Sequence, residues 1–303
     1  MRRFSKWLLI PTLFWAAMAI ASPQVTEAGG RGGLEGRGGY GSYVYKSVGG
    51  VDLEAHVFSP DNGDAEAKRS AIVMFHGGGW NVGSPEWTFS PCRYFAARGM
   101  VAVAAQYRLA DEQAITPLEA MSDARSVFRW LRRNADELGI DPNRIAGAGW
   151  SAGGHLVACA AIFDDAPGKD RVEAGPNAMV LWYPAVAVAR DRWFAKLLGD
   201  RAEAREVSPA EHVRPDVPAT IIFQGSTDKV TPLAGVQLFC ERMKQVGNRC
   251  DLHVYKDQGH LFSLNNLRAR RDAMRKADRF LASEGFLKGE PDEAMLHGGA
   301  RAR

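Results

Sequence analysis

Near its middle the chain reads Gly147-Ala148-Gly149-Trp150-Ser151-Ala152-Gly153-Gly154. Within this stretch, residues 149–153 spell G-x-S-x-G, the spacing of a sharp turn between a strand and a helix. The serine of such a turn has a strained backbone, so the residues two positions before and after it must be small. Residues 143–146 predict the incoming strand, and residues 152–163 predict the outgoing helix. Ser151 is therefore a candidate nucleophile, placed where a helix N-terminus favours developing negative charge.

The same stretch also fits a second pattern. Gly147, Gly149 and Ala152 match G-x-G-x-x-A, a dinucleotide-binding fingerprint that likewise follows a strand and opens a helix. That fingerprint normally lies in the first strand–helix–strand unit and requires an acidic residue at the end of the next strand. Here it lies mid-chain, and Asp164 and Asp165 come at the end of the helix instead. We therefore favour the nucleophile pattern and predict no cofactor.

Alternating strands and helices are predicted through most of the chain. Continuous apolar runs, typical of strands covered on both faces, occupy residues 71–75, 100–105, 178–182 and 219–223. Residues 252–255 are half polar, as in an outer strand, and residues 43–47 and 51–58 predict a hairpin around Gly49-Gly50. Helices are predicted over residues 117–138, 232–246 and 265–284. This order predicts an α/β fold with a doubly wound, mostly parallel central sheet flanked by helices.

Acyl transfer by a serine needs a base, an acid that orients the base, and donors for the oxyanion. The candidate base is His260, which follows the strand ending at residue 255, and the candidate acid is Asp228, which follows the strand ending at residue 223. The chain order Ser, Asp, His is the one that such sheets use. Asp257 and Asp251 are rival acids, but neither follows an earlier central strand.

A glycine-rich loop follows the first apolar strand directly. It reads His76-Gly77-Gly78-Gly79-Trp80, and three glycines allow bare backbone N–H groups to face a ligand. The N–H of Ala152 would be the partner donor. We expect His76 to hold the loop through hydrogen bonds of its ring rather than to act as a second base.

Composition and charge limit the partners. The 303 residues are 46% hydrophobic and 24% charged, which suits one large domain. The formal net charge is +3, and Arg2, Arg3 and Lys6 account for it, so the rest of the chain is neutral. A neutral chain argues against nucleic acid or an anionic membrane surface as a partner. The oligomeric state is left open.

The N-terminus predicts export to the periplasm or beyond. Basic residues precede the apolar run 7–20, and Ala19-Ile20-Ala21 offers a cleavage site. An uncleaved anchor is the alternative, but the run is shorter than the ~20 residues that a membrane span needs. We expect a signal peptide at 1–21 with no stable membrane association after cleavage. The remaining expected segments are a Gly-rich linker at 22–41, a catalytic domain at 42–288 and a flexible tail at 289–303.

Four cysteines are present, at positions 92, 159, 240 and 250. A helix that turns back into a strand could bring Cys240 and Cys250 within bridging range, so the pair is either a disulfide or two buried thiols. Neither a C-x-x-C motif nor a Cys/His cluster occurs, and we predict no metal site.

Together these motifs resemble the α/β-hydrolase superfamily, and within it the esterases with an H-G-G-G loop. The likeness is greatest to the acetyl-esterase and feruloyl-esterase-like (BD-FAE-like) branch, near the hormone-sensitive-lipase-like group, and it covers residues 45 to 287. The matching segments are His76 to Trp80, Tyr107-Arg108-Leu109, Asp123-Ala124 with Trp130-Leu131, Gly149 to Gly154, Asp228 and Gly259-His260.

The resemblance implies hydrolysis of carboxylic esters through an acyl-serine intermediate, without a cofactor. Ser151 would attack the carbonyl, His260 would take and return the proton, and Asp228 would orient His260. Gly78, Gly79 and Ala152 would donate to the oxyanion, with Gly77 and Gly78 as the pair used in shorter-loop relatives.

One departure from the lipase-like members bears on the substrate. Those members carry an N-terminal helical cap. In this chain residues 22–41 are too short and glycine-rich to form such a cap, and residues 184–218 could form only a small lid. An open pocket would suit acetyl or other short-chain esters, including carbohydrate-linked ones. The alternatives are a serine peptidase of the same fold, which usually has a large extra domain, and a non-catalytic binding protein, which usually lacks the nucleophile or the base.

Overall fold

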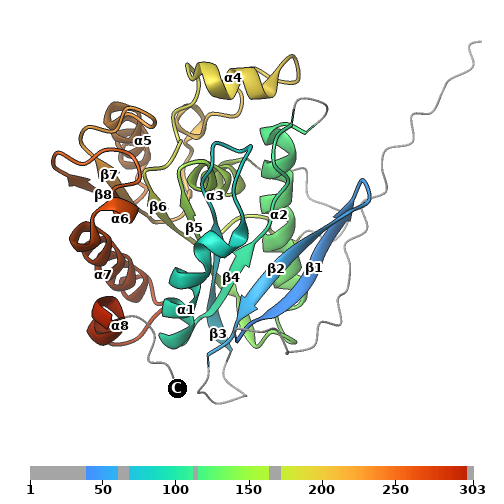
Figure 1. Ribbon diagram of the computed structural model, residues 1–303, viewed down its shortest axis with the longest axis vertical. Helices are drawn as coiled ribbons and strands as arrows, with labels where there is room; N and C mark the ends of the chain where they lie inside the picture. The colour runs from blue at the N-terminus through green and yellow to red at the C-terminus, as the bar shows by residue number, and fades with distance from the viewer. Residues whose placement is uncertain (1–38, 61–67, 112–114, 164–171, 299–303) are drawn as a thin grey trace, which may run out of the picture.

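A computed structural model describes residues 39–60, 68–111, 115–163 and 172–298. The predicted signal peptide and almost all of the predicted linker lie outside these residues. Eight strands form one sheet in the order β1-β2-β4-β3-β5-β6-β7-β8 (Figure 1). Their bounds are β1 Gly41–Val48, β2 Val51–Phe58, β3 Arg69–Phe75, β4 Val101–Ala105, β5 Ile140–Trp150, β6 Ala178–Trp182, β7 Thr220–Gly225 and β8 Cys250–Tyr255.

The sheet is parallel from β4 to β8, and the hairpin β1–β2 joins it in antiparallel fashion through β4. The half-polar run at residues 252–255 lies in the edge strand β8, as the sequence predicted. Strand β5 is longer than the predicted 143–146, because it pairs with β3 up to Gly149 and with β6 up to Trp150. The α/β fold with a mostly parallel sheet is confirmed.

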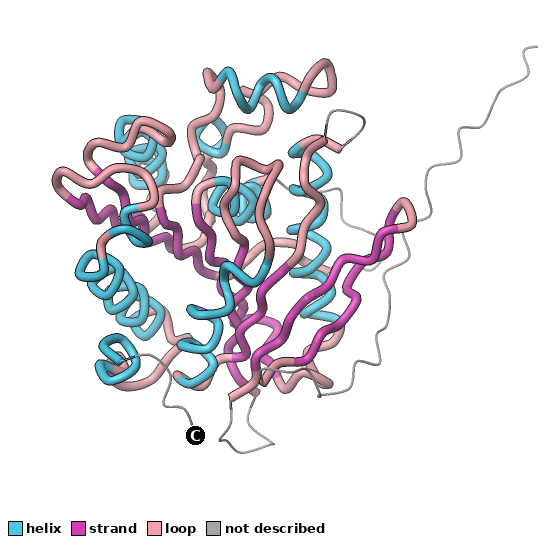
Figure 2. The backbone as a smooth tube through the Cα atoms, in the orientation of Figure 1, coloured by secondary structure: helices cyan, strands magenta, loops and turns pink. Residues whose placement is uncertain are grey.

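Helices cover both faces of the sheet, as the tube drawing shows (Figure 2). One face packs against α2 Pro117–Arg133, α3 Ala152–Ile162 and α5 Leu233–Gln245, and the other against α1 Phe89–Ala97 and α7 Leu267–Ser283. The shorter helices are η1 Pro85–Thr88, α4 Arg192–Leu198, η2 Pro209–His212, α6 Phe262–Asn265 and α8 Glu293–Gly298. None of the helices that the structure describes is long and apolar enough to cross a bilayer.

The predicted last helix, 265–284, is confirmed as α7, which spans Leu267–Ser283, and the short helix α6 directly precedes it. Asn266 ends α6 and begins α7, where its side chain accepts a hydrogen bond from the N–H of Ala269. An asparagine that satisfies an orphan N–H in this way favours a helix start over a helix interior.

The tail also differs from the prediction of a loose segment after residue 289. Its residues 293–298 form α8, which packs against α7, where Arg275 makes a bidentate ion pair with Glu293. Apolar Met295 and Leu296 pack against the core beneath α1 and α7. The ion pair and this apolar contact together explain why a polar segment is ordered.

Cys240 and Cys250 form a disulfide, the first of the two states that the sequence left open. Their Cα atoms lie 5.4 Å apart, within the usual range for a bridge between the end of a helix and the start of the next strand. Cys92 and Cys159 are buried free thiols.

Candidate active site

Ser151 lies between the end of β5 and the start of α3, with φ +52° and ψ −115°. This backbone conformation is strained for a residue with a side chain. A Cβ on Gly149 would overlap the backbone of Gly153, and a Cβ on Gly153 would overlap the carbonyl of Phe75. Both glycines of the G-x-S-x-G pattern are therefore required by close backbone approach, and the turn holds the Ser151 side chain at the carboxyl edge of the sheet.

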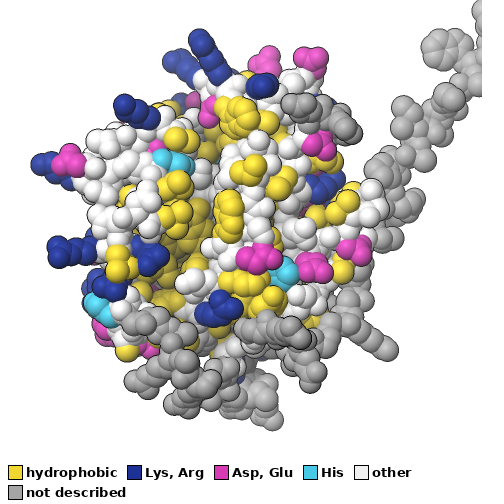
Figure 3. Space-filling view, in the orientation of Figure 1, with side chains coloured by type: hydrophobic (Ala, Val, Ile, Leu, Met, Phe, Trp, Pro, Cys, Tyr) yellow, Lys and Arg dark blue, Asp and Glu magenta, His cyan; other side chains and the backbone are white. Residues whose placement is uncertain are grey.

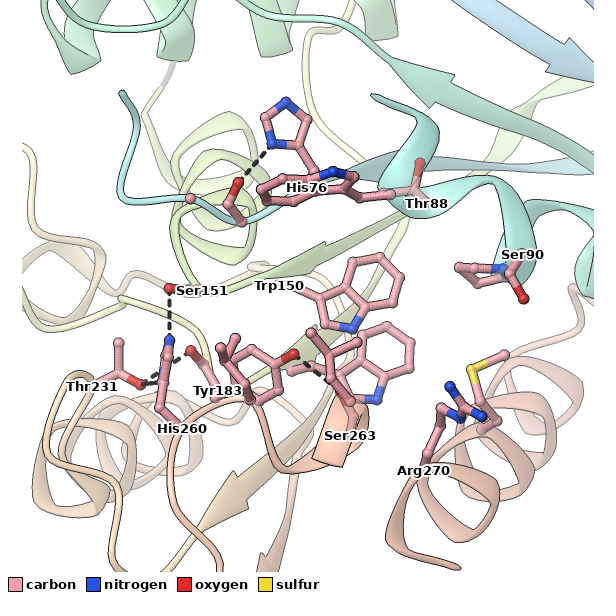
Figure 4. A pocket seen from close by; sticks show the side chains of 18 of the residues that line it. His76, Thr88, Ser90, Trp150, Ser151, Tyr183, Thr231, His260, Ser263 and Arg270 are labelled. Carbon is pink, nitrogen blue, oxygen red and sulfur yellow. Dashed lines mark hydrogen bonds between the residues drawn. The ribbon is translucent and has the colours of Figure 1, made fainter. Parts of the chain in front are cut away.

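The structure brings the three predicted site residues together from the ends of β5, β7 and β8. His260 Nε2 lies 3.1 Å from Ser151 Oγ (Figure 4). On the other side of the ring, His260 Nδ1 lies 2.7 Å from Asp228 Oδ2. The chain of hydrogen bonds runs from the hydroxyl through the imidazole to a carboxylate that is buried. The rival acid Asp257 is exposed, and its carboxylate makes no such contact.

Asp228 is held as an ionised carboxylate. Its Oδ1 accepts the N–H groups of Val230 and Thr231 at 2.8 and 2.9 Å, and its Oδ2 accepts Gln224 Nε2 at 3.0 Å and Thr231 Oγ1 at 2.9 Å. Burial alone would raise the pKa of Asp228. The hydrogen bonds from His260 and from the backbone of Thr231 outweigh burial and lower that pKa.

Three residues of this site were not predicted. Thr231 and Gln224 orient the carboxylate of Asp228, and Tyr183 packs its ring edge-on against His260 at 4.8 Å between centroids. The Asp-x-x-Thr spacing is a local signal for the first contact, because an Asp side chain often accepts from the backbone two and three residues on. Tyr183 has φ +37° and lies directly after β6, and nothing in its local sequence distinguishes it.

The sequence suggests that Gly259, directly before His260, allows the tight loop that presents the ring, but the structure places the required glycine elsewhere. A Cβ on Gly259 would meet nothing within 4 Å, whereas a Cβ on Gly225 would overlap the carbonyl of Gln258. The close packing is thus between the end of β7 and the His260 loop. Gly259 is not needed for a tight turn.

The glycine loop after β3 lies over the Ser151 turn. A Cβ on Gly77 would stand 3.1 Å from the carbonyl of Trp150, and Gly78 and Gly79 have φ +118° and +58°. Within the described residues, no acceptor takes the N–H groups of Gly78, Gly79 or Ala152. These donors remain available to a ligand, as an oxyanion site requires.

The other histidines near the site hold structure. His76 bonds the carbonyl of Gly77 at 2.6 Å and stacks on Tyr107, so the ring fixes its own loop. His155 is completely buried, where it receives Trp80 Nε1 at 3.3 Å and bonds the Val207 carbonyl at 3.0 Å. Burial lowers the pKa of His155 to about 4, so the ring is neutral at physiological pH.

Comparison with known proteins places the chain in a family. The sequence model of a family described as alpha/beta hydrolase fold matches residues 72–264. The chain belongs to the alpha/beta hydrolase fold family. Its resemblance to esterases is confirmed by the relatives, while the assignment to the acetyl- and feruloyl-esterase-like branch stays a prediction.

Among curated relatives of this alpha/beta hydrolase, carboxylesterase NlhH of Mycobacterium tuberculosis is 40% identical over 118 residues, 37% of this chain and 34% of the relative. Ethyl acetate hydrolase of Pseudomonas putida is 34% identical over 136 residues, 45% of this chain and 41% of the relative. The matches thus span less than half of each curated protein. The solved structure of Thermogutta terrifontis esterase 2 phosphorylated by paraoxon is 38% identical with a TM-score of 0.77, covering 84% of this chain and 97% of that one.

A large cavity of about 1420 Å³ opens from the Ser151 hydroxyl of this alpha/beta hydrolase. It is hollowed between hydrophobic side chains on the face that carries α1, α7 and α8 (Figure 3). The segment between β6 and β7 contributes only α4 and η2, and Trp193 of α4 donates to the Gly79 carbonyl at 3.3 Å. The described residues include no group of three or more His, Cys, Asp or Glu side chains that could hold a metal ion.

Proposed function

We propose that this protein is a carboxylic ester hydrolase that acts through a covalent acyl intermediate on Ser151. The observation that carries the proposal is the continuous hydrogen-bonded chain Ser151–His260–Asp228 beside the free N–H groups of the glycine loop. The named activities of the relatives, carboxylesterase, ethyl acetate hydrolase and esterase, support the same reaction.

In the first half-reaction, His260 Nε2 takes the proton from Ser151 Oγ as that oxygen attacks the ester carbonyl. The carbonyl oxygen becomes an oxyanion, to which the N–H groups of Gly78, Gly79 and Ala152 donate. When the tetrahedral intermediate collapses, the C–O bond to the alcohol breaks and the leaving oxygen receives the proton from His260. Asp228 keeps the proton on Nδ1, so that Nε2 is free to act as a base.

In the second half-reaction, water replaces the alcohol. His260 takes a proton from the water, the hydroxide oxygen attacks the acyl carbon, and the proton returns to Ser151 Oγ as the acid leaves. The enzyme regains its starting state, so no cofactor or metal is required.

We also infer that small acyl groups are accepted. The relative named ethyl acetate hydrolase supports this substrate class, as does the β6–β7 segment, which contributes only α4 and η2 and leaves a large cavity open at the serine. Carbohydrate-linked esters, the other class predicted from the sequence, remain a prediction, which release of acetate from acetylated xylan would test.

The test is turnover of p-nitrophenyl acetate by the wild type and by Ser151→Ala. The variant should lose activity by several orders of magnitude, because the members of such a triad act as a unit. Incubation with paraoxon should add one diethylphosphoryl mass to the wild type and none to the variant. Undiminished hydrolysis by the variant would refute the mechanism, and a peptide substrate cleaved in place of esters would favour the peptidase alternative.

Export is inferred separately, from the basic start of the chain, the apolar run 7–20 and Ala19-Ile20-Ala21. The disulfide between Cys240 and Cys250 supports it, because disulfides persist mainly in oxidising compartments. N-terminal sequencing of the protein recovered from the periplasmic or extracellular fraction should begin at Ser22. An intact N-terminus in the membrane fraction would instead indicate an anchor.

A further inference from the structure

The cavity at Ser151 continues as a groove lined by α1 and α7, and α8 lines its far end. We call this part the α1–α7 groove. Its floor contains the indole of Trp150, which stacks on Trp182 with ring centroids 4.5 Å apart and planes 6° from parallel. The register that pairs Trp150 with Trp182 across β5 and β6 creates this flat aromatic floor.

The surroundings of the groove are apolar to an unusual degree for an open surface. Of the ten large apolar side chains that the described residues expose, six line this one cavity: Trp87, Trp193, Val230, Leu261, Leu264 and Leu267. Leu264 is 64% exposed and Leu267 is 45% exposed, and both lie on the α6–α7 side of the groove. A concentration of exposed apolar side chains around a single cleft marks a binding site for apolar material.

Among the described residues, the charged side chains that line the far end are arginines: Arg93 of α1, and Arg270 and Arg271 of α7. The one carboxylate in the described lining, Asp191, belongs to α4 and caps that helix. Arg270 borders the cavity in Figure 4, and its guanidinium has no hydrogen-bond or ion-pair partner among the described residues. An anionic group would therefore meet a cation at this end, and no acid of the described lining would oppose it.

The direction of the groove relates it to one side of the ester. Leu261, Ser263, Leu264 and Leu267, which follow His260 in the chain, all line the cavity. His260 is the group that hands its proton to the departing alcohol in the proposed mechanism. A substrate chain that leaves the reacting carbon on the His260 side is the alcohol portion of the ester.

We propose that the α1–α7 groove binds the alcohol portion of the substrate, an extended apolar chain that lies across Trp150 and ends in an anionic group beside Arg270. This inference rests on the proposed esterase function and specifies its substrate class as acetyl or similar short acyl esters of a long alcohol with an acidic end. A carbohydrate alcohol would leave most of the apolar lining uncontacted.

Binding of the apolar part of the alcohol in the groove is tested with four acetates of primary alcohols, in which the reacting bond is the same. They are ethyl acetate, octyl acetate, 8-acetoxyoctanoate and its methyl ester. We expect kcat/KM, measured as acetate release, to be about tenfold higher for octyl than for ethyl acetate, well below the gain for full burial of six methylenes. Ser90 is exposed on α1 and lines the cavity, so Ser90→Trp should reduce the octyl-to-ethyl ratio toward one. Ala97→Trp, on an exposed position of the same helix away from the cavity, is the matched control.

The anionic end is tested with 8-acetoxyoctanoate against its neutral methyl ester. Arg270→Gln should lower the ratio of their kcat/KM values about three- to fivefold, the scale of an exposed ion pair. Arg268→Gln, an exposed neighbour on α7 that does not line the cavity, should leave that ratio unchanged.

The outcomes separate the two proposals. Loss of all ester hydrolysis, or its persistence in Ser151→Ala, would overturn the proposed function. If ethyl acetate turnover depends on Ser151 but octyl acetate shows no gain, or Ser90→Trp behaves like Ala97→Trp, the groove assignment is wrong. If kcat/KM rises only with the acyl length of p-nitrophenyl alkanoates, the groove does not bind the alcohol portion. If Arg270→Gln leaves the ratio of kcat/KM for 8-acetoxyoctanoate to that for its methyl ester unchanged, the proposed anionic end of the alcohol is wrong.

Discussion

Replacing Asp228 by asparagine tests the orientation of His260 with almost no change in volume. Asparagine Oδ1 can still accept the N–H groups of Val230 and Thr231 that now meet Asp228 Oδ1 at 2.8 and 2.9 Å. The second position becomes an NH₂ group, which would face His260 Nδ1 at the present 2.7 Å. Two donors cannot share that distance, so the imidazole places its proton on Nε2 instead.

An Nε2–H tautomer cannot take the proton of Ser151, which lies 3.1 Å away. We therefore expect kcat for p-nitrophenyl acetate to fall roughly 10⁴-fold, the scale found when such a triad has the wrong tautomer. This corresponds to about 5.4 kcal/mol of transition-state stabilisation. Because the triad acts as a unit, adding Asp228→Asn to Ser151→Ala should cause little further loss.

Asp257→Asn is the matched control, because Asp257 is the other acid near His260 in sequence and its side chain is exposed. Its kcat should stay within about twofold of the wild type, as for a surface substitution without a partner. Circular dichroism on each variant would show that the fold is retained. Activity of Asp228→Asn within tenfold of the wild type, or a large loss in Asp257→Asn, would refute the assignment of Asp228.

Three further predictions concern stability. Gly153→Ala should lower the free energy of unfolding by about 3 kcal/mol, because the added Cβ would overlap the backbone carbonyl at the end of β3. Gly259→Ala, where a Cβ meets no atom, should change that free energy by less than about 0.5 kcal/mol. Denaturant titration of both variants measures the difference, and equal effects would contradict the prediction. Cys240 and Cys250 are ten residues apart, and reduction of their disulfide should lower the free energy of unfolding by about 2.5 kcal/mol through loop entropy. Thermal melting with and without dithiothreitol measures the effect, and an unchanged melting temperature would count against the bridge. The pKa of His155 is about 4 in the folded protein, below its unfolded value, so only the unfolded state gains a proton as the pH falls from about 6.5 to 4. The free energy of unfolding should therefore drop by about 3 kcal/mol over this range. His155→Gln should flatten the dependence of this free energy on pH. An equally steep profile in that variant would assign the pH dependence to other groups.

The candidate reacting residues could be located from the sequence because their signals are local. Ser151 is identified by glycines two positions away, Asp228 follows the apolar strand β7, and His260 follows the half-polar edge strand β8. Parallel strands bring their carboxyl ends to one edge of the sheet, so three such residues converge without any knowledge of distances. The glycine loop after β3 is found by the same rule.

The supporting contacts could not be predicted, because they join positions that are distant in the chain. Tyr183 reaches His260 only through packing of the β6 end against the β8 loop, and the close approach that needs a glycine is at Gly225 rather than at Gly259. The ordered α8 was missed for the same reason, since the ion pair of Arg275 with Glu293 joins two helices. Local pattern does not distinguish a solvated charge from a paired one.

The order of the strands, the long helices between them, the G-x-S-x-G turn and the candidate residues Ser151, Asp228 and His260 could thus be read from the sequence alone, because each depends on periodicity or on spacing within a few residues. The groove was decided only by the tertiary structure. Its floor depends on the register that stacks Trp150 on Trp182, and its walls depend on how far α1 and α7 stand apart on the sheet. Chemistry at a strand end is a local property, whereas the shape of a substrate site is a sum of long-range packing contacts.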